Sequence, residues 1–339
     1  MTRLLRRVLL APAVVALTVL LWLTGPLWLI AAAALSPVLP GRWRPLRLLW
    51  LVIVYLTCES VLLVVLFGWW LAAGFGRRLR TPYFQGLHYD LAQGLLWVVF
   101  REARRVLNLT IATDGPTPDA HPGRPLLVCC RHAGPGDSLI LLHALMHDYQ
   151  REPRVVLKDT MAWDPMVDVI MSRIPARFIS PHPRDGEELE PLIAALAAGL
   201  DANDAFVIFP EGGNFTPARR DRAIARLHRL GLERMAARAE AMTHVLAPRP
   251  GGFLAALDAA PDADVVMVAH TGLDHLLTVA DVWRELPMDK RITMRWWTVP
   301  RAEIPHDRDS RIEWLFGWWE RIDAWIAENR PEEVPSGRR

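Results

Sequence analysis

Two long apolar segments near the amino terminus constrain what this chain can fold into. Residues 8–39 contain no charged side chain, and residues 48–74 contain only Glu59. Each segment exceeds the ~20 apolar residues with which a helix crosses the hydrocarbon core of a bilayer. Apolar residues on all sides of such a helix leave no polar face for water. We therefore expect residues 1–78 to form a hydrophobic helical hairpin that anchors the chain to a membrane.

Two other interpretations of these segments remain open. Arg3, Arg6 and Arg7 precede the first segment, as in a cleaved signal peptide, although the segment is about twice the usual length of a signal-peptide core. A buried hairpin in a soluble core is the second interpretation. Arginines before, between and after the segments favour cytoplasmic termini only weakly, so the hairpin either spans the bilayer or enters it without crossing. Gly25-Pro26 predicts a kink in the first helix.

The rest of the chain has the pattern of a soluble α/β domain. Short apolar segments predict buried strands, and amphipathic segments predict helices. Strands that alternate with helices favour a mostly parallel or mixed central sheet flanked by helices. We expect this domain over residues 79–330 and a loose tail over 331–339. The predicted strands are 125–130, 155–157, 177–180, 205–209, 265–269 and 292–299, and the predicted helices are 187–200, 219–242 and 310–329.

Composition excludes several classes of protein. The 339 residues are 52% hydrophobic, which excludes an intrinsically disordered chain. A formal net charge of +2 gives no reason to expect a nucleic-acid partner. Three cysteines, two of them adjacent, cannot build a disulfide framework and favour a reducing compartment. Cys130 and His132 lack the further ligands of a zinc site, so we expect no metal.

A histidine and an aspartate follow the first predicted strand at a spacing suited to catalysis. His132 and Asp137 lie five positions apart across a Gly-Pro-Gly turn. An imidazole is the usual general base near neutral pH, and a carboxylate on its other nitrogen fixes the tautomer and stabilises the imidazolium. The spacing alone is weak evidence, because His143 and Asp148 share it by accident within a predicted helix. A structural role for the first pair therefore stays open at this point.

A second polar turn follows the predicted strand 205–209. Here Glu211 is followed by Gly212, Gly213 and Asn214. An acidic side chain at a strand end can accept a hydrogen bond from a hydroxyl or orient basic neighbours, and free backbone N–H groups in such a turn favour anions. An ordinary strand-to-helix turn is the alternative. In a mostly parallel sheet, loops of this kind lie where ligands bind.

Taken together, these turns resemble the signatures of the glycerolipid acyltransferases of the lysophosphatidic-acid acyltransferase type. That family carries His-x4-Asp, here HAGPGD, and Phe-Pro-Glu-Gly-Thr-Arg, here FPEGGN. The resemblance covers about residues 80–328 and is nearer to the eukaryotic-like branch. Further segments that resemble the family are Lys158 after a strand, 176–188 with Arg184, 246–257, 265–270 without the usual proline, and 314–326.

One departure from the family pattern concerns the acceptor. The family's Glu-Gly-Thr-Arg reads Glu-Gly-Gly-Asn here, and the missing arginine is commonly assigned to the acceptor phosphate. Asn214 cannot supply that charge or the paired donors of a guanidinium. The resemblance implies that Lys158, Arg184, Arg219 and Arg220 meet phosphates of the acceptor or of coenzyme A. Otherwise the acceptor is not a phosphate monoester.

The resemblance implies direct transfer of a fatty acyl group from acyl-CoA or acyl carrier protein to a hydroxyl of a lysophospholipid such as 1-acylglycerol-3-phosphate. His132 would be the general base, oriented by Asp137, while Glu211, Gly212, Gly213 and Asn214 would bind substrate. No cofactor beyond the acyl donor is expected. A bacterial inner membrane with a cytoplasmic catalytic domain fits this scheme. Two alternatives remain, a lipid-binding or scaffold relative without activity and a lipid ester hydrolase.

Overall fold

The computed structural model describes residues 3–39, 41, 43–115, 123–134, 136–180, 189–272, 274, 283, 285 and 289–331. The chain forms two compact units, each assembled from separate stretches of sequence. The first unit comprises Met1–Leu109, Leu139–Leu192 and Trp283–Asp289. The second comprises Thr110–Ser138, Ile193–Val282 and Lys290–Arg339. The division at residue 78 and the separate tail stay predictions.

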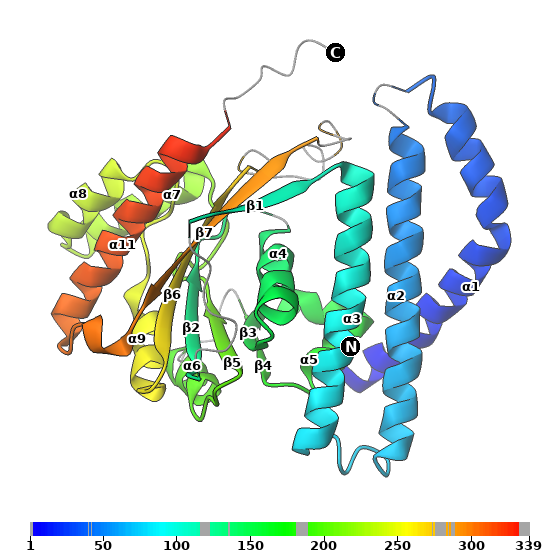
Figure 1. Cartoon of the computed structure of the whole chain (residues 1–339), viewed down its shortest axis with the longest axis horizontal. Helices are drawn as coiled ribbons and strands as arrows, with labels where there is room; N and C mark the ends of the chain where they lie inside the picture. Colours follow the sequence, from blue (N-terminus) through cyan, green and yellow to red (C-terminus); the bar gives the residue numbers. More distant parts are fainter. Residues whose placement is uncertain are drawn as a thin grey trace. The chain divides into compact units, whose positions relative to one another are not determined.

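Three long helices begin the first unit, α1 (Arg3–Leu35), α2 (Arg44–Ala72) and α3 (Pro82–Leu107). The first two contain the predicted apolar segments, and both are long and apolar enough to cross a membrane. Helix α1 contains Pro12 and Pro26 and changes direction along its length in Figure 1. The unit also contains η1 (Ala144–Asp148), β3 (Glu152–Lys158), η2 (Asp159–Trp163), α5 (Pro165–Met171) and β4 (Ala176–Ile179), with β3 and β4 parallel.

Helices α1 and α2 pack against each other through small polar side chains. The Thr18 hydroxyl donates to the Val14 carbonyl oxygen (2.9 Å) and lies 3.2 Å from that of Leu56, while the Ser60 hydroxyl donates to Thr18 Oγ1 (2.8 Å). Such hydrogen bonds satisfy hydroxyl groups that water does not reach. Large apolar side chains such as Leu23 and Leu27 point outward from α1 and are exposed. This exposure is what a lipid-facing helix requires.

The second unit is built on a mixed sheet with the strand order β1-β7-β6-β2-β5. Strand β2 lies between β5 and β6 and is parallel to both, whereas β6 and β7 are antiparallel and β1 is parallel to β7. The predicted α/β class with a mixed sheet is thereby confirmed. The strand bounds are β1 (Thr110–Asp114), β2 (Leu126–Cys130), β5 (Asp204–Ile208), β6 (Asp264–Thr271) and β7 (Arg291–Val299).

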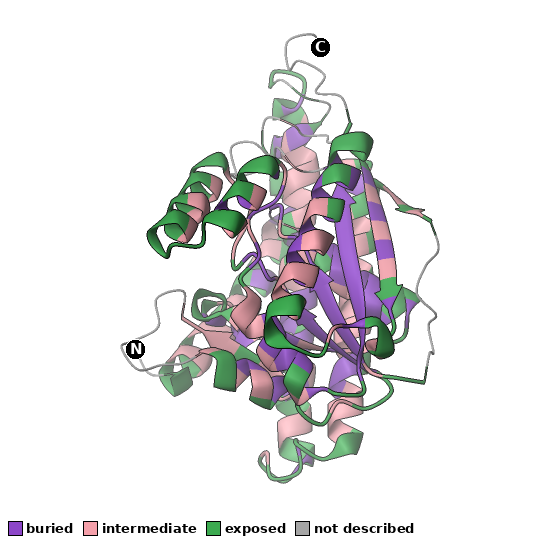
Figure 2. Ribbon diagram, turned by 90° about the vertical axis from the view of Figure 1, so that its left-hand side faces the viewer, coloured by how far each residue is buried: buried purple, intermediate pink, exposed green. Residues whose placement is uncertain are grey.

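Helices cover this sheet and close its core. Every residue of β2, β5 and β6 is buried, and the strands are purple in Figure 2. Phe316 and Trp319 of α11 are fully buried, and α11 contacts β6. The helical elements of this unit are α6 (Leu189–Ala197), which begins at the end of the first unit, α7 (Pro217–Arg229), α8 (Glu233–Ala241), α9 (Pro250–Ala259), η3 (Arg301–Glu303) and α11 (Arg308–Asn329). Helix α4 (Asp137–His143) begins in it.

One helix prediction is wrong. The segment 219–242 was expected to be a single surface helix, but it forms α7 and α8 with a break at Leu230–Leu232. Gly231 has φ +69°, a left-handed conformation that ends a helix and that glycine adopts without steric cost. The arginine pattern continues across the break and hides it in the sequence.

An ion pair in the first unit ties the start of α1 to α5. Arg3 Nε and Arg7 Nε lie 2.6 Å and 2.5 Å from the two carboxylate oxygens of Asp168, which is buried. We expect Asp168→Asn to lower the free energy of unfolding by about 1–2 kcal/mol, because two guanidinium groups lose their shared carboxylate. Thermal unfolding in detergent micelles measures this. Asp159→Asn, at an exposed position of the same unit, is the control and should change little.

Candidate active site

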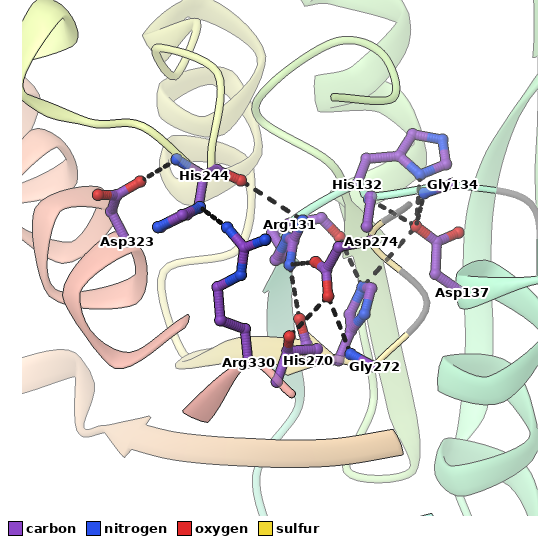
Figure 3. A network of polar contacts seen from close by, with 12 residues as sticks. Arg131, His132, Gly134, Asp137, His244, His270, Gly272, Asp274, Asp323 and Arg330 are labelled. Carbon is purple, nitrogen blue, oxygen red and sulfur yellow. Dashed lines mark hydrogen bonds and ion pairs between the residues drawn. The ribbon is translucent and has the colours of Figure 1, made fainter. Parts of the chain in front are cut away.

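The candidate site lies where three neighbouring strands of the second unit end. Because β2 is parallel to β5 and β6, the carboxyl ends of all three strands lie at one edge of the sheet. Arg131 and His132 directly follow β2, the Phe209–Phe215 loop follows β5, and Asp274 follows β6. The structure therefore brings together the two turns that the sequence marked and a third turn that it did not. Figure 3 shows the turns that follow β2 and β6.

His132 and Asp137 form a hydrogen-bonded pair. His132 Nδ1 lies 2.8 Å from Asp137 Oδ2. An ionised carboxylate only accepts hydrogen bonds, so Nδ1 carries a proton, and in the neutral ring Nε2 is the nitrogen with the lone pair. The His132 side chain is 18% exposed, so the pair is reachable from solvent while Asp137 is buried. This is the arrangement of a general base with an orienting carboxylate.

Asp137 stays ionised although it is buried at the start of α4. Its Oδ2 also accepts from the backbone N–H groups of Ala133 (2.9 Å) and Gly134 (3.2 Å), and Oδ1 accepts from the N–H of Ser138 (2.6 Å). Burial acts to raise the pKa of Asp137, but the hydrogen bond from His132, the charges of His132 and His270, and the Gly134 N–H hold the pKa below its usual value. The turn therefore fixes the carboxylate before any substrate binds.

The loop after β5 forms hydrogen bonds with both backbone groups of His132. Glu211 Oε1 accepts from the N–H of His132 (3.2 Å), and the N–H of Phe215 donates to the carbonyl oxygen of His132 (2.7 Å). Glu211 Oε2 accepts from the N–H of Leu246 (3.2 Å). The Phe209 ring lies 4.6 Å from the imidazole, centroid to centroid. Glu211 is fully buried, and its carboxylate supports the backbone of His132.

Glu211 titrates far from its ordinary value. Burial raises the pKa of Glu211 from 4.5 to about 7, against the opposing effects of the Arg131 charge and of the two N–H donors. The loss of hydration therefore outweighs these stabilising contacts, and near neutral pH the protonated and ionised forms of Glu211 are present in comparable amounts.

Arg131 is a fully buried cation behind the His132–Asp137 pair. Its Nη1 donates to the carbonyl oxygen of His270 (2.7 Å) and to Asp274 Oδ1 (2.5 Å). Asp274 Oδ2 in turn accepts from the Thr271 hydroxyl (2.6 Å) and from the N–H of Gly272 (2.9 Å). This network joins the loop after β2 to the loop after β6 (Figure 3). Burial opposes the ionised form of Asp274, but the Arg131 charge lowers the pKa of Asp274 well below its usual range.

His270 is buried beside the same carboxylate. Its Nε2 lies 3.8 Å from Asp137 Oδ2 and 3.4 Å from the carbonyl oxygen of Arg131. Burial, and then the charge of Arg131, lower the pKa of His270 to about 4, so the ring is neutral near neutral pH. The sequence marked the segment 265–270 as similar to the family but indicated no role for His270, Arg131 or Asp274. Only their positions could have revealed them in the sequence, since all three lie at the ends of adjacent parallel strands.

The other predicted site residues fall into separate groups. Gly212, with φ +69°, and Gly213 form the turn after Glu211. Arg219 Nη1 donates to the carbonyl oxygen of Asn214 (3.0 Å), so this guanidinium lies at the turn. Arg220 instead donates to carbonyl oxygens at the end of α8, namely those of Met242 (2.7 Å) and Glu240 (2.6 Å). Lys158 ends β3 in the first unit, and Arg184 lies outside the described residues.

Arg249 is a basic residue at the turn that sequence reasoning did not assign. Its side chain packs so closely on Gly212 that a Cβ there would lie 3.3 Å from Arg249 Cζ. Loss of hydration in this contact, and then the like charge of Arg226, lower the pKa of Arg249. Two guanidinium groups, those of Arg219 and Arg249, therefore flank the turn that carries Asn214. The signal available for it was its place in the segment 246–257, which resembles the family.

Two other kinds of chemistry receive no support from the described residues. Cys129 and Cys130 are buried within β2, and burial raises the pKa of both thiols, which disfavours a thiolate nucleophile. Within the described ranges, no three His, Cys, Asp or Glu side chains are grouped to hold a metal ion. His143, from the competing pair, stacks on Phe100 at 3.8 Å between ring centroids in the first unit.

The sequence matches a known family over the segment that builds this site. The family model described as Acyltransferase matches residues 96–270, which is more than half of the chain. The chain belongs to the acyltransferase family. The predicted resemblance is thereby confirmed, and the eukaryotic-like branch stays a prediction. The matched segment includes the turns with His132, Asp137 and Glu211.

Comparison with solved structures adds a further similarity. The chain is similar to the crystal structure of the 1-acyl-sn-glycerophosphate (LPA) acyltransferase, PlsC, from Thermotoga maritima. The identity is 14%, the similarity covers 81% of this chain and 99% of that chain, and the TM-score is 0.44. No curated protein matches the sequence of this acyltransferase.

The raised pKa of Glu211 predicts a pH-dependent contribution to stability. The folded protein binds the Glu211 proton more tightly than the unfolded chain does, so this contribution falls as the pH rises from 4.5 to about 7. We expect wild type to lose about 1–3 kcal/mol relative to Glu211→Gln across this window. Melting temperatures of both proteins below and above the window measure this. The exposed Glu303→Gln is the control, and a constant difference between wild type and Glu211→Gln would contradict the assignment.

Proposed function

We propose that this acyltransferase transfers a fatty acyl group from acyl-CoA or acyl carrier protein to a hydroxyl of a lysophospholipid such as 1-acylglycerol-3-phosphate. The observation that carries the proposal is the His132–Asp137 pair, 2.8 Å apart, with a buried carboxylate and a partly exposed imidazole. The family to which the chain belongs supports the reaction class.

In the proposed reaction His132 Nε2 takes the proton of the acceptor hydroxyl. The acceptor oxygen attacks the thioester carbonyl carbon, and the carbon–sulfur bond of the donor breaks. The departing thiolate then takes the proton from the imidazolium. Asp137 accepts from Nδ1–H throughout and stabilises the imidazolium. Glu211 and Phe215 hold the backbone of His132 and thereby position the base.

Arg219 and Arg249 are the cations that we assign to a phosphate of the substrates. Both guanidinium groups lie at the turn that contains Asn214, and neither forms an ion pair with a carboxylate among the described residues. Guanidinium groups bind phosphate oxygens through charge-assisted hydrogen bonds. Lys158 and Arg184 remain further candidates for this role. Arg220 is engaged with α8, which favours a structural role for it.

The apolar helices α1 and α2 fit an enzyme of membrane lipids. The diacylated product of the proposed reaction does not leave a bilayer readily, so an anchored enzyme forms it where it resides. We propose that these helices anchor the protein in a bacterial inner membrane, with the catalytic domain in the cytoplasm. Their length and composition support the anchor.

Hydrolysis through an acyl-enzyme needs an activated side-chain nucleophile, and the described residues of the site do not offer one. The Ser138 hydroxyl lies 3.3 Å from Asp137 Oδ1 and has no hydrogen bond to the imidazole. The cysteines next to the site are buried in β2. The absence of a Ser–His or Cys–His pair in the described part of the chain favours direct transfer to an acceptor over hydrolysis through an acyl-enzyme.

Purified full-length protein with labelled acyl-CoA and a panel of lysolipids tests the proposed reaction. The panel pairs 1-acylglycerol-3-phosphate with neutral monoacylglycerol and with lysophospholipids that carry larger headgroups. Acylation of a lysolipid is the expected result. Labelled free acid without an acceptor would support a hydrolase, and binding of lipid without any reaction would support a scaffold.

We expect His132→Ala to lower kcat by at least ~100-fold with the fold retained, because the general base is lost. His143→Ala is the matched control, since His143 has the same spacing to an aspartate but packs on Phe100. Initial rates at saturating substrate and a melting curve for each variant measure this. Near-normal turnover of a folded His132→Ala protein would contradict the assignment.

We expect Arg249→Gln to raise KM by about tenfold for the phosphate-bearing acceptor relative to neutral monoacylglycerol, since a charge-assisted hydrogen bond contributes about 1.5–3 kcal/mol. Arg308→Gln, at the exposed start of α11, is the control. Steady-state kinetics with both acceptors measure the ratio. An equal change for both acceptors would show that Arg249 does not bind the acceptor phosphate.

A further inference from the structure

The corner between α7 and α8 exposes two large apolar side chains. Leu230 is 59% exposed and Leu232 is 45% exposed, and they flank Gly231 at the end of α7. The two helices lie side by side next to α11 in Figure 1. Single exposed leucines are common on protein surfaces, but here two of them flank one turn. The corner therefore differs from the polar turns that normally join surface helices.

One face of α7 adds positive charge to this corner. Arg219, Arg222, Arg226 and Arg229 recur every three or four residues, so they lie along one face of the helix, and all four are exposed. The half-buried apolar residues of the helix, Ala223, Ile224 and Leu227, lie on another face. Residues 217–232 contain five arginines against one aspartate.

This charge is not neutralised as it is on the neighbouring helix. On α8, Arg238 pairs with Glu313 (2.7 Å) and Glu320 (2.5 Å), and Arg234 pairs with Glu313 (3.1 Å). By contrast, Arg226 and Arg229 have no carboxylate partner among the described residues. The positive charge of this part of the unit is thus concentrated on the outer face of α7.

The arginine face of α7 begins at the candidate active site. Thr216 caps the helix directly after the loop that holds His132, and Arg219 donates to the carbonyl oxygen of Asn214. The charge of Arg226 acts on Arg249, which packs on Gly212. The face therefore runs from the loop beside the base to the exposed leucines at the corner.

We propose that the α7–α8 corner is a second bilayer contact, in which the arginine face of α7 lies on anionic phospholipid headgroups and Leu230 and Leu232 enter the interface. Basic helices with apolar residues beside the charges bind such surfaces. The exposed leucines favour a bilayer over an acidic carrier protein, which the arginines alone would also fit. If the proposed function holds, this contact places the entrance of the site at the headgroups of its lipid acceptor.

A fluorescent probe at the corner tests the contact without requiring catalysis. The three native cysteines are buried, so an environment-sensitive label on Leu230→Cys reports on this position alone. Full-length protein is placed in nanodiscs of phosphatidylcholine with or without phosphatidylglycerol, and with or without nitroxide lipids. The matched control is Asp262→Cys, which is exposed at the amino-terminal end of β6.

We expect the label on Leu230→Cys to shift to the blue and to be quenched by nitroxide lipids when phosphatidylglycerol is present, and the label on Asp262→Cys to be unaffected. The further substitutions Arg222→Gln and Arg229→Gln in the labelled protein should abolish most of the shift, because the attraction is electrostatic. Added salt should have the same effect. A label that stays in water in anionic nanodiscs would overturn the proposal. A shift that requires added acidic carrier protein, in neutral nanodiscs, would assign the face to that protein instead.

Kinetics separate this proposal from the proposed function. Leu230→Ser with Leu232→Ser should raise KM severalfold for an acceptor embedded in anionic nanodiscs and leave kcat/KM for a short-chain, water-soluble acceptor unchanged. Equal kinetics of wild type and variant on both acceptors would show that the corner does not deliver lipid. A protein that acylates no acceptor but still shows the probe shift would refute the proposed function and leave the bilayer contact in place.

Discussion

The position of the His132 imidazole depends on the hold that the loop after β5 has on the main chain of that residue. The carboxylate of Glu211 accepts a hydrogen bond from the N–H of His132, and the N–H of Phe215 donates one to the carbonyl oxygen of His132. With both backbone groups fixed, the hydrogen bond from Nδ1 to Asp137 only has to set the rotation of the ring. The loops that follow two adjacent parallel strands thus fix the backbone of His132 at their shared edge of the sheet.

The groups around His132 include charges that would each destabilise the fold if they were withdrawn from water alone. Arg131, Glu211, Asp137 and Asp274 are all withdrawn from water to different degrees, and each has hydrogen bonds or an opposite charge nearby. An unpaired buried charge is strongly destabilising, so the members of this cluster depend on one another. His270 fits the same cluster as a neutral ring, because a second cation beside Arg131 would be unfavourable.

Two arginines from elsewhere in the fold lie at the turn with Asn214. Arg219 reaches the turn from the start of α7, and Arg249 reaches it from the segment before α9. In the proposed function these two residues provide the cationic surroundings that Asn214 lacks. The arginine face of α7 continues from this point to the exposed leucines, so the proposed phosphate site and the proposed bilayer contact share one surface.

The sequence by itself determined the apolar helices, the buried strands and the His132–Asp137 pair, because these depend on local periodicity or on a short turn. It did not reveal the break at Gly231, since the arginine spacing continues across it. Only the tertiary structure decided that Glu211 binds the backbone of His132, that Arg131, His270 and Asp274 support the pair, and that Arg249 lies on Gly212. Those contacts join residues far apart in the chain, and strand order rather than sequence spacing brings such residues together.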